Sequence, residues 1–214
     1  MNSNMNSKSL RFALILSLIT IFYNLAEGAV SVIFGAGDKT LALLGFGIDS
    51  FVEVISGIGI LHMVLRMKYS EVNSRDKFEK TALKITGSGF YLLTAGLIAG
   101  SAINLIEGIK PLTTTAGIII SSISILTMYW LFKSKIKAGS ELKSDAVIAD
   151  AECTKTCFYL SIILLVSSLL YEFSGIGFID VLGSLGIAYY SFKEGRESFE
   201  KIKSGSLACT CGDD

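Results

Sequence analysis

Four side chains that can bind metal ions lie in two pairs within long apolar segments. Asp49 and Glu53 occur in the stretch LLGFGIDSFVEVISGIGIL, and Cys153 and Cys157 occur in VIADAECTKTCFYLSIILLV. A separation of four residues places both members of a pair on one face of a helix, about one turn apart. Two such helices that face each other could supply two carboxylates and two thiolates to one metal ion.

The types of these ligands favour a soft or borderline divalent ion. Thiolates select zinc and softer metals, whereas Mg²⁺ and Ca²⁺ prefer sites made only of oxygen. Ionisable residues are costly inside a membrane, so their presence there indicates transport or relay. The sequence therefore predicts a transported ion rather than a bound cofactor, with Zn²⁺ favoured, Cd²⁺ next, and Co²⁺ or Fe²⁺ left open.

The composition indicates the kind of chain that carries these pairs. Hydrophobic residues make up 51% of the 214 residues, there is a single proline, and the mean hydropathy is +0.58. These values are typical of an all-α polytopic membrane protein. We expect six transmembrane helices in one bundle, covering residues 12–34, 40–65, 82–106, 112–132, 145–171 and 176–192.

The basic residues predict how the chain lies in the membrane. Lysines and arginines flank the beginning of the first span, the connections after the second and fourth spans, and the end of the sixth, whereas the opposite side has only Lys39 and Lys110. The positive-inside rule then predicts that both termini are cytoplasmic, and we expect the protein in the plasma membrane. Residues 1–11 would form an N-terminal segment, 12–192 the transport domain, and 193–214 a short tail with the CxC motif. The formal net charge of zero gives no indication of a nucleic-acid partner.

The paired motifs also resemble those of a known family. The stretch from Leu43 to Gly57 resembles the second transmembrane helix of the cation diffusion facilitators, SDAVIADAECTKTC resembles the fifth, and IDVLGSLGIAYYSFKE with its leading Asp180 resembles the sixth. Position by position, Asp49 and Glu53 stand for one half of the family's transport site. Cys153 and Cys157 stand where relatives usually have histidine and aspartate.

This resemblance implies a zinc/proton antiporter that forms a homodimer, from a short branch without the family's cytoplasmic C-terminal domain. The chemistry of the ligands fits proton exchange, because buried thiols and carboxyls hold protons that a metal must displace. We therefore expect export of the metal ion in exchange for protons.

Other polar residues are weaker candidates. Glu27 in NLAEG and Glu107 in NLIEG lie near the outer ends of two spans, where they could collect cations or could simply be interfacial helix ends. Glu152 lies next to Cys153, and we expect the neighbouring Lys155 to form an ion pair or to extend toward the interface.

The remaining candidates are cysteines of the tail and one histidine. Cys209 and Cys211 form a CxC motif that could capture metal or could belong to an unstructured end. His62, the single histidine, is expected at a helix end and not as a ligand.

The alternatives to a transporter are a membrane-embedded metal-binding accessory or sensor protein, and a thiol-redox membrane enzyme that uses Cys153 and Cys157. The second is disfavoured because a four-residue helical spacing differs from the CxxC motif of such enzymes. No nucleophile lies beside a base in the sequence, so we do not expect an enzyme. A cleaved signal peptide at the N-terminus is also disfavoured, because the apolar run continues through AVSVIFGAG.

Overall fold

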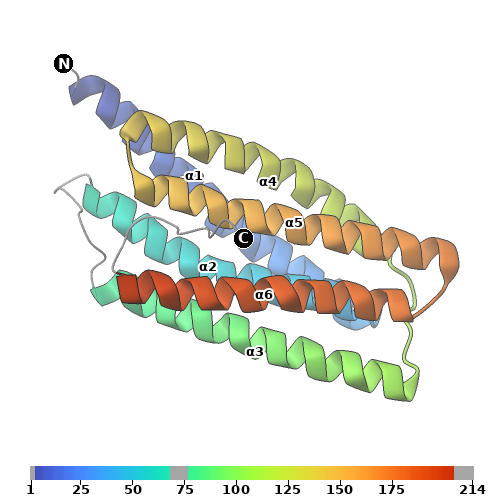
Figure 1. Ribbon diagram of the computed structural model, residues 1–214. Coiled ribbons are helices and arrows are strands. Elements are labelled where there is room, and N and C mark those ends of the chain that lie inside the picture. The colour runs from blue at the N-terminus through green and yellow to red at the C-terminus, as the bar shows by residue number, and fades with distance from the viewer. Residues whose placement is uncertain (1–2, 68–76, 205–214) are drawn as a thin grey trace.

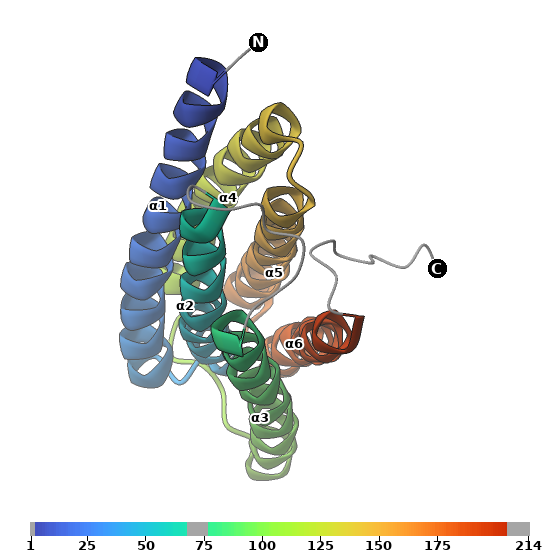
Figure 2. The ribbon, with the colours of Figure 1, turned by 90° about the vertical axis from the view of Figure 1, so that its left-hand side faces the viewer.

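The computed structural model describes residues 3–67 and 77–204, which form a bundle of six α-helices (Figure 1). The helices are α1 (Ser3–Gly37), α2 (Leu41–Met67), α3 (Lys77–Glu107), α4 (Thr115–Leu142), α5 (Asp145–Ser174) and α6 (Phe178–Ser204). They pack mainly in the pairs α1 with α2, α4 with α5, and α3 with α6. Helix α2 also contacts α3, α5 and α6. This helix, which contains Asp49 and Glu53, therefore lies in the middle of the bundle (Figure 2).

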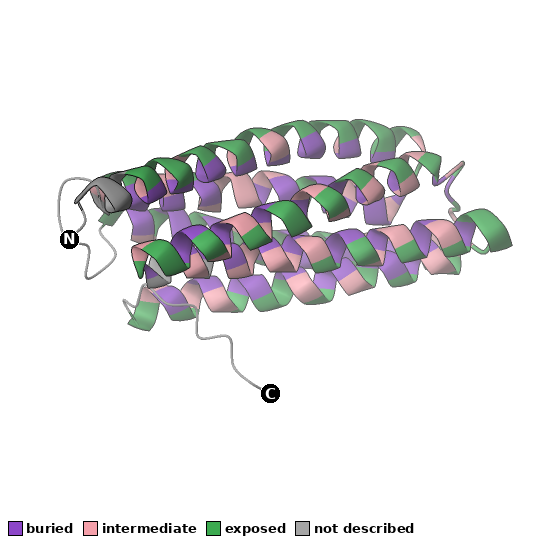
Figure 3. Ribbon diagram, turned by 90° about the horizontal axis from the view of Figure 1, so that it is seen from above, coloured by how far each residue is buried: buried purple, intermediate pink, exposed green. Residues whose placement is uncertain are grey.

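The chain is an integral membrane protein of helices. Among the described residues, α1 to α5 each contain a segment long and apolar enough to cross a membrane. Large apolar side chains point outward, with Leu92 75%, Ile106 84% and Phe173 88% exposed, while buried residues line the facing sides of the helices (Figure 3). Soluble proteins rarely expose apolar surface on this scale. The expected fold class is thus confirmed.

Helix α6 differs from the other five in composition. The expected sixth span, 176–192, is helical from Phe178, but α6 does not reach the hydropathy of a membrane span. Its buried side is rich in glycine, serine and acidic residues, and charged residues follow from Lys193 onward. This polar side faces the centre of the bundle, where Ser191 donates a hydrogen bond to Asp49 of α2.

The basic residues collect at one end of the bundle. The beginnings of α1, α3 and α5 and the ends of α2, α4 and α6 lie together at that end (Figure 1). The described lysines and arginines occur in the half of the bundle next to these helix ends, and only Lys39 and Lys110 lie at the opposite end. The expected partition of charge between two sides is therefore present in the fold.

Specific residues set the helix boundaries at both ends. At the basic end, the side chain of Ser144 caps α5 by accepting a hydrogen bond from the backbone N–H of Val147. At the other end, Gly175 terminates α5 with a φ of 67°, a left-handed conformation that suits glycine. Asp180, in the first turn of α6, accepts hydrogen bonds from the backbone N–H groups of Leu41 (2.8 Å) and Ala42 (3.2 Å), and so caps α2.

Two apolar clusters occupy the two halves of the bundle. One includes Leu16, Ile60 and Leu131 toward the basic end, and the other includes Phe46, Leu164 and Ile187 toward the opposite end. Along α2, residue 53 lies between Phe46 and Ile60, and the polar residues of the neighbouring helices lie at the same level. The two apolar clusters therefore enclose a polar layer in the middle of the bundle.

Helices α1 and α2 approach each other closely beside this layer. A Cβ atom placed on Gly47 would lie 2.8 Å from the backbone nitrogen of Val32, and one on Gly35 would lie 2.5 Å from the backbone nitrogen of Leu44. No side chain fits at these distances. The glycines thus allow α1 to bring Asn24 and Glu27 against α2.

Candidate functional site

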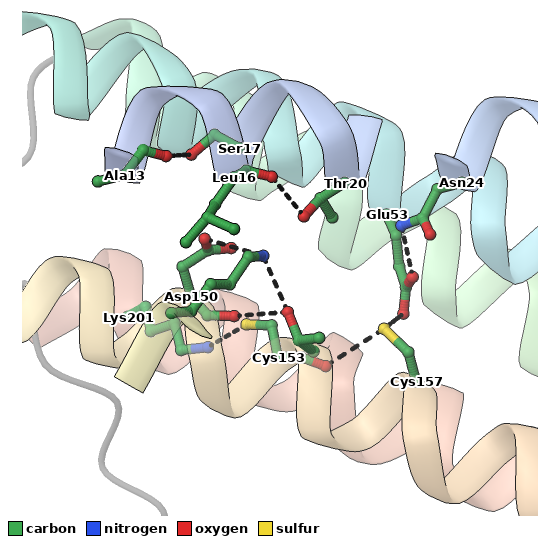
Figure 4. A network of polar contacts seen from close by, with 12 residues as sticks. Ala13, Leu16, Ser17, Thr20, Asn24, Glu53, Asp150, Cys153, Cys157 and Lys201 are labelled. Atoms are coloured by element: carbon green, nitrogen blue, oxygen red, sulfur yellow. Dashed lines mark hydrogen bonds and ion pairs between the residues drawn. The ribbon is translucent and has the colours of Figure 1, made fainter. Parts of the chain in front are cut away.

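One residue from each predicted pair meets in the polar layer. The thiol of Cys157 on α5 donates a hydrogen bond to Glu53 Oε1 on α2, with a sulfur–oxygen distance of 2.6 Å. The other carboxylate oxygen of Glu53 accepts a hydrogen bond from Asn24 Nδ2 on α1 at 2.9 Å (Figure 4). Three helices therefore converge on the carboxyl group of Glu53.

A small internal cavity of about 40 Å³ adjoins this contact. A volume of this size has room for about three water molecules. The ionisable and sulfur side chains that line it are Glu53, Lys135, Asp150, Cys153, Cys157, Glu194 and Lys201. The cavity thus collects acids, thiols and ammonium groups from α2, α4, α5 and α6.

The other two residues of the predicted set point to α6. Asp49 is buried and accepts a hydrogen bond from Ser191 Oγ at 2.8 Å, and it does not line the cavity. Cys153 lines the cavity with its sulfur 3.7 Å from Lys201 Nζ. The structure therefore brings Glu53 and Cys157 together but does not gather all four residues around one point.

The described residues contain no cluster of three or more histidine, cysteine, aspartate or glutamate side chains in a geometry ready to hold a metal ion. In a tetrahedral zinc site with Zn–S of about 2.3 Å and Zn–O of about 2.1 Å, the sulfur and oxygen lie about 3.6 Å apart. Glu53 and Cys157 would have to separate by about 1 Å, and Cys153 or Glu194 would have to turn toward them. In the observed arrangement the thiol proton occupies the space between the two ligands.

Two buried oxygen atoms beside the cavity have no hydrogen-bond partner among the described residues. They are Oδ1 of Asn24 and Oγ1 of Thr86, and each of these side chains is 1% exposed. Buried polar atoms nearly always have a partner, which can be an ordered water or a ligand. Both residues line the cavity, so its walls suit a polar occupant.

A buried ion pair forms the basic side of the cavity. Lys135 on α4, 1% exposed, lies with Nζ 2.9 Å from Asp150 Oδ2 and also donates to Thr154 Oγ1 at 2.9 Å. A buried charge of this kind is stable only with a partner. Asp150 therefore neutralises Lys135 and joins the ends of α4 and α5 around the cavity.

Glu27 and Glu107 lie in different surroundings. Glu27 is buried, and its carboxylate accepts hydrogen bonds from Tyr23 (2.9 Å) and from Ser50 on α2 (3.3 Å). Its interpretation as an interfacial helix end is therefore wrong, because the close packing of α1 on α2 encloses it. Glu107 is exposed at the last residue of α3, in agreement with that interpretation.

The remaining candidates lie away from the cavity or outside the described residues. Glu152 forms an ion pair with Lys155 at 3.1 Å, which confirms the role expected for Lys155. His62 lies near the end of α2, 3.4 Å from Glu79, as expected for a helix-end residue. Cys209 and Cys211 fall outside the described residues.

The sequence interpretation missed Glu194 and Lys201 of α6. Both are buried, at 8% and 7% exposure, and both line the cavity. A signal for them exists, because Ser191, Glu194, Ser198 and Lys201 follow one another at steps of three or four residues and so share one face of a helix. The expected span ends at residue 192, whereas α6 continues to Ser204 with this face toward the bundle.

Comparison with known proteins adds no relative from which a role could be assigned. No protein-family model matches the sequence, and the search of curated proteins gives no match. The resemblance to the cation diffusion facilitators therefore rests on the motifs alone.

Proposed function

We propose that the protein is a membrane transporter for a divalent transition-metal cation, with Zn²⁺ as the favoured cargo and Cd²⁺ as the next. The observation that carries this proposal is the contact between the Cys157 thiol and the Glu53 carboxyl group across α2 and α5, at the wall of an internal cavity. Both belong to the four residues that the paired motifs predicted to share one site. A carboxylate and a thiolate on the same centre suit zinc and not magnesium.

The proposed exchange replaces a proton by the metal. The proton that Cys157 donates to Glu53 lies where a metal would bridge the sulfur and the oxygen. Binding of the metal releases this proton, and return of a proton from the other side releases the metal. Cys153 and Glu194, which line the same cavity, would complete the coordination after a change of rotamer.

The distribution of charge supports the proposed direction of transport. The end of the bundle that carries most lysines and arginines would face the cytoplasm under the positive-inside rule, with both termini on that side of the plasma membrane. The cavity extends from the middle of the bundle toward this end, since Asp150 and Lys201 belong to the helix turns there. We propose that it receives metal from the cytoplasm for export, by a protein that acts as a homodimer.

Flux measurements with purified protein in liposomes test this function. Zn²⁺ movement would be followed with an enclosed fluorescent indicator under an imposed pH gradient, for the native protein and for Glu53→Gln, Cys157→Ser and the control Glu107→Gln. Glu107 is an exposed acid of α3 outside the cavity. We expect the pH gradient to drive flux that E53Q and C157S abolish and E107Q retains.

Two other results would contradict the proposal. Zinc that binds to the protein stoichiometrically without accumulating in the vesicles would indicate an accessory or sensor protein. Flux that is equal in E53Q, C157S and the native protein would exclude this pair of residues from the transport site.

A further inference from the structure

Glu27 is a buried acid that the proposed metal site does not use. It lies on α1 and is 7% exposed, and the hydroxyl groups of Tyr23 (2.9 Å) and of Ser50 on α2 (3.3 Å) contact its two carboxyl oxygens. Ser124 of α4 also forms a hydrogen bond with it. None of the ion pairs among the described residues includes Glu27. A buried carboxylate without a positive partner is strongly unfavourable, so this group must hold a proton or another cation.

The hydrogen bonds of Ser50 favour the proton. Ser50 Oγ lies 3.3 Å from Glu27 Oε2 and 3.1 Å from the backbone oxygen of Phe46. A serine hydroxyl has a single proton, so it donates to one of these two oxygens at a time. When it donates to Phe46, the contact with Glu27 is a hydrogen bond only if the carboxyl group supplies the proton. These surroundings therefore fit a neutral carboxylic acid.

Glu27 lies beyond the metal site, on the side away from the basic end. Helix α1 starts at the basic end, and Thr20 and Asn24, which precede Glu27 by about two turns and one turn, line the cavity. Asn24 donates a hydrogen bond to Glu53 (Figure 4), and Ser50, three residues before Glu53 on α2, contacts Glu27. The two carboxyl groups are therefore joined crosswise, through one polar residue on each helix.

A further polar side chain continues this line toward the opposite end. Ser31 follows Glu27 by four residues and so lies on the same face of α1, where it packs against Gly47 of α2. It is 0% exposed, and its Oγ atom has no hydrogen-bond partner among the described residues. Buried hydroxyl groups nearly always have a partner, which can be an ordered water. Glu27 thus has a polar neighbour on both sides along α1, Asn24 toward the cavity and Ser31 away from it.

A groove between α1 and α4 reaches Glu27 from the outer surface of the bundle. Its volume is about 190 Å³, and its lining residues are Tyr23, Ala26, Glu27, Val30, Ile120 and Ile123. Val30 and Ile123 belong to the exposed apolar surface that faces the membrane. An apolar reagent dissolved in the membrane or in a micelle can therefore approach the carboxyl group of Glu27.

We propose that Glu27 is a proton-binding site separate from the metal site, and that its proton is one of those exchanged for the metal. The second part rests on the proposed function, whereas the proton site itself does not. The titratable groups that face Glu27 are Tyr23 on α1 and Asp49 and Glu53 on α2, and α4 contributes the neutral Ser124. A divalent ion at Glu53 and a proton on Glu27 repel each other, which couples binding of the metal to release of the proton.

Carbodiimide labelling of the native protein tests the proton site. Dicyclohexylcarbodiimide is apolar and reacts with protonated carboxylic acids. The carboxyl oxygen bonds to the central carbon, the acid proton moves to one nitrogen, and the acyl group then shifts to nitrogen, which gives a stable N-acylurea without a leaving group. Native protein in micelles would be labelled at about pH 6 and at about pH 9, and the modified residue would be located by mass spectrometry of peptides.

We expect label on Glu27 at the lower pH and a several-fold loss of label at the higher pH, where the carboxyl group has given up its proton. A water-soluble carbodiimide serves as the control for access, and it should modify Glu107, exposed at the end of α3, but not Glu27. Absence of label from Glu27 at the lower pH, or equal label at both pH values, would overturn the inference.

A comparison of salts distinguishes a proton from a metal cation. The oxygen atoms around Glu27 are hard ligands that also suit Na⁺, so labelling would be repeated in sodium chloride and in choline chloride at the same pH and ionic strength. We expect equal label in the two salts. Protection by sodium would make Glu27 a sodium site and would contradict the proton site.

The liposome flux assay tests whether this proton takes part in the exchange. We expect a pH gradient to accelerate Zn²⁺ flux in the native protein and in Glu107→Gln but not in Glu27→Gln. Native protein labelled to different extents gives the same comparison without a variant, because the flux should fall in proportion to the label on Glu27. A native response to the pH gradient in E27Q would overturn this part of the inference. If the native protein shows no zinc flux, the proposed function is wrong, whereas pH-dependent label on Glu27 still supports the proton site.

Discussion

Replacing Asp180 by alanine tests how α6 is joined to the beginning of α2. The carboxylate of Asp180 is 3% exposed and accepts hydrogen bonds from two backbone N–H groups, those of Leu41 and Ala42. These N–H groups belong to the first turn of α2 and have no acceptor within their own helix. The substitution leaves both donors in a buried position without their acceptor.

The expected loss of stability is about 2–4 kcal/mol. A hydrogen bond to a charged group contributes about 1.5–3 kcal/mol, and a negative charge at a helix N-terminus adds about 0.3–1 kcal/mol. The second bond, at 3.2 Å, is longer than the first and contributes less. Asp180→Asn retains one acceptor oxygen without the charge, so we expect it to lose about half as much as Asp180→Ala.

The free energy of unfolding would be measured in mixed micelles by titration with a denaturing detergent, using the near-ultraviolet signal of the single tryptophan, Trp130. Glu107→Ala serves as the control, since it removes an exposed acid from a helix end at the same side of the bundle. The order of stability should be native and E107A, then D180N, then D180A. A D180A protein within about 0.5 kcal/mol of the native one would refute this account of the cap.

Three further predictions follow from the polar layer and the helix contacts. Lys135→Ala should destabilise the protein by about 3–5 kcal/mol because it leaves Asp150 buried without its partner, and a double variant Lys135→Met/Asp150→Leu should recover much of this loss in the same unfolding assay. Metal affinity should fall as the pH falls, by up to about tenfold per pH unit for each proton that the metal displaces. Cd²⁺ titrations between about pH 6 and 8 would measure the slope of the logarithm of the affinity against pH. A slope that is zero would show that no proton is released. Gly47→Ala should cost about 1–3 kcal/mol because its Cβ would lie 2.8 Å from the Val32 nitrogen, whereas Gly96→Ala, which meets no atom within 4 Å, should be neutral.

The part of the fold that follows from hydrophobicity could be predicted from the sequence. The five apolar helices and the separation of basic residues to one end are consequences of transfer free energies that depend on composition. Helical spacing also placed Glu53 and Cys157 among the four residues expected at one site, although it did not single out the contact between these two.

The parts that could not be predicted depend on which helices lie next to each other. Asp49 and Cys153 were expected to share one site with Glu53 and Cys157, but each contacts α6, and the packing of α6 against α2 and α5 is a property of the assembled bundle. The contact of Asn24 with Glu53 could not be predicted for the same reason. The Asn24 amide reaches Glu53 because glycines let α1 approach α2 closely. Hydropathy alone also predicts that the sixth span ends before Glu194. The polar residues beyond residue 191 nevertheless recur at helical spacing and form the face of α6 that packs against the bundle.

The volume of the cavity has a consequence for the rate of transport. The cavity has room for about three water molecules, whereas a fully hydrated divalent ion carries about six. The proposed cargo must therefore shed about half of its hydration shell before it reaches Glu53. Ions that exchange water slowly, such as Mg²⁺, would then be rejected by the kinetics of dehydration as well as by the ligands.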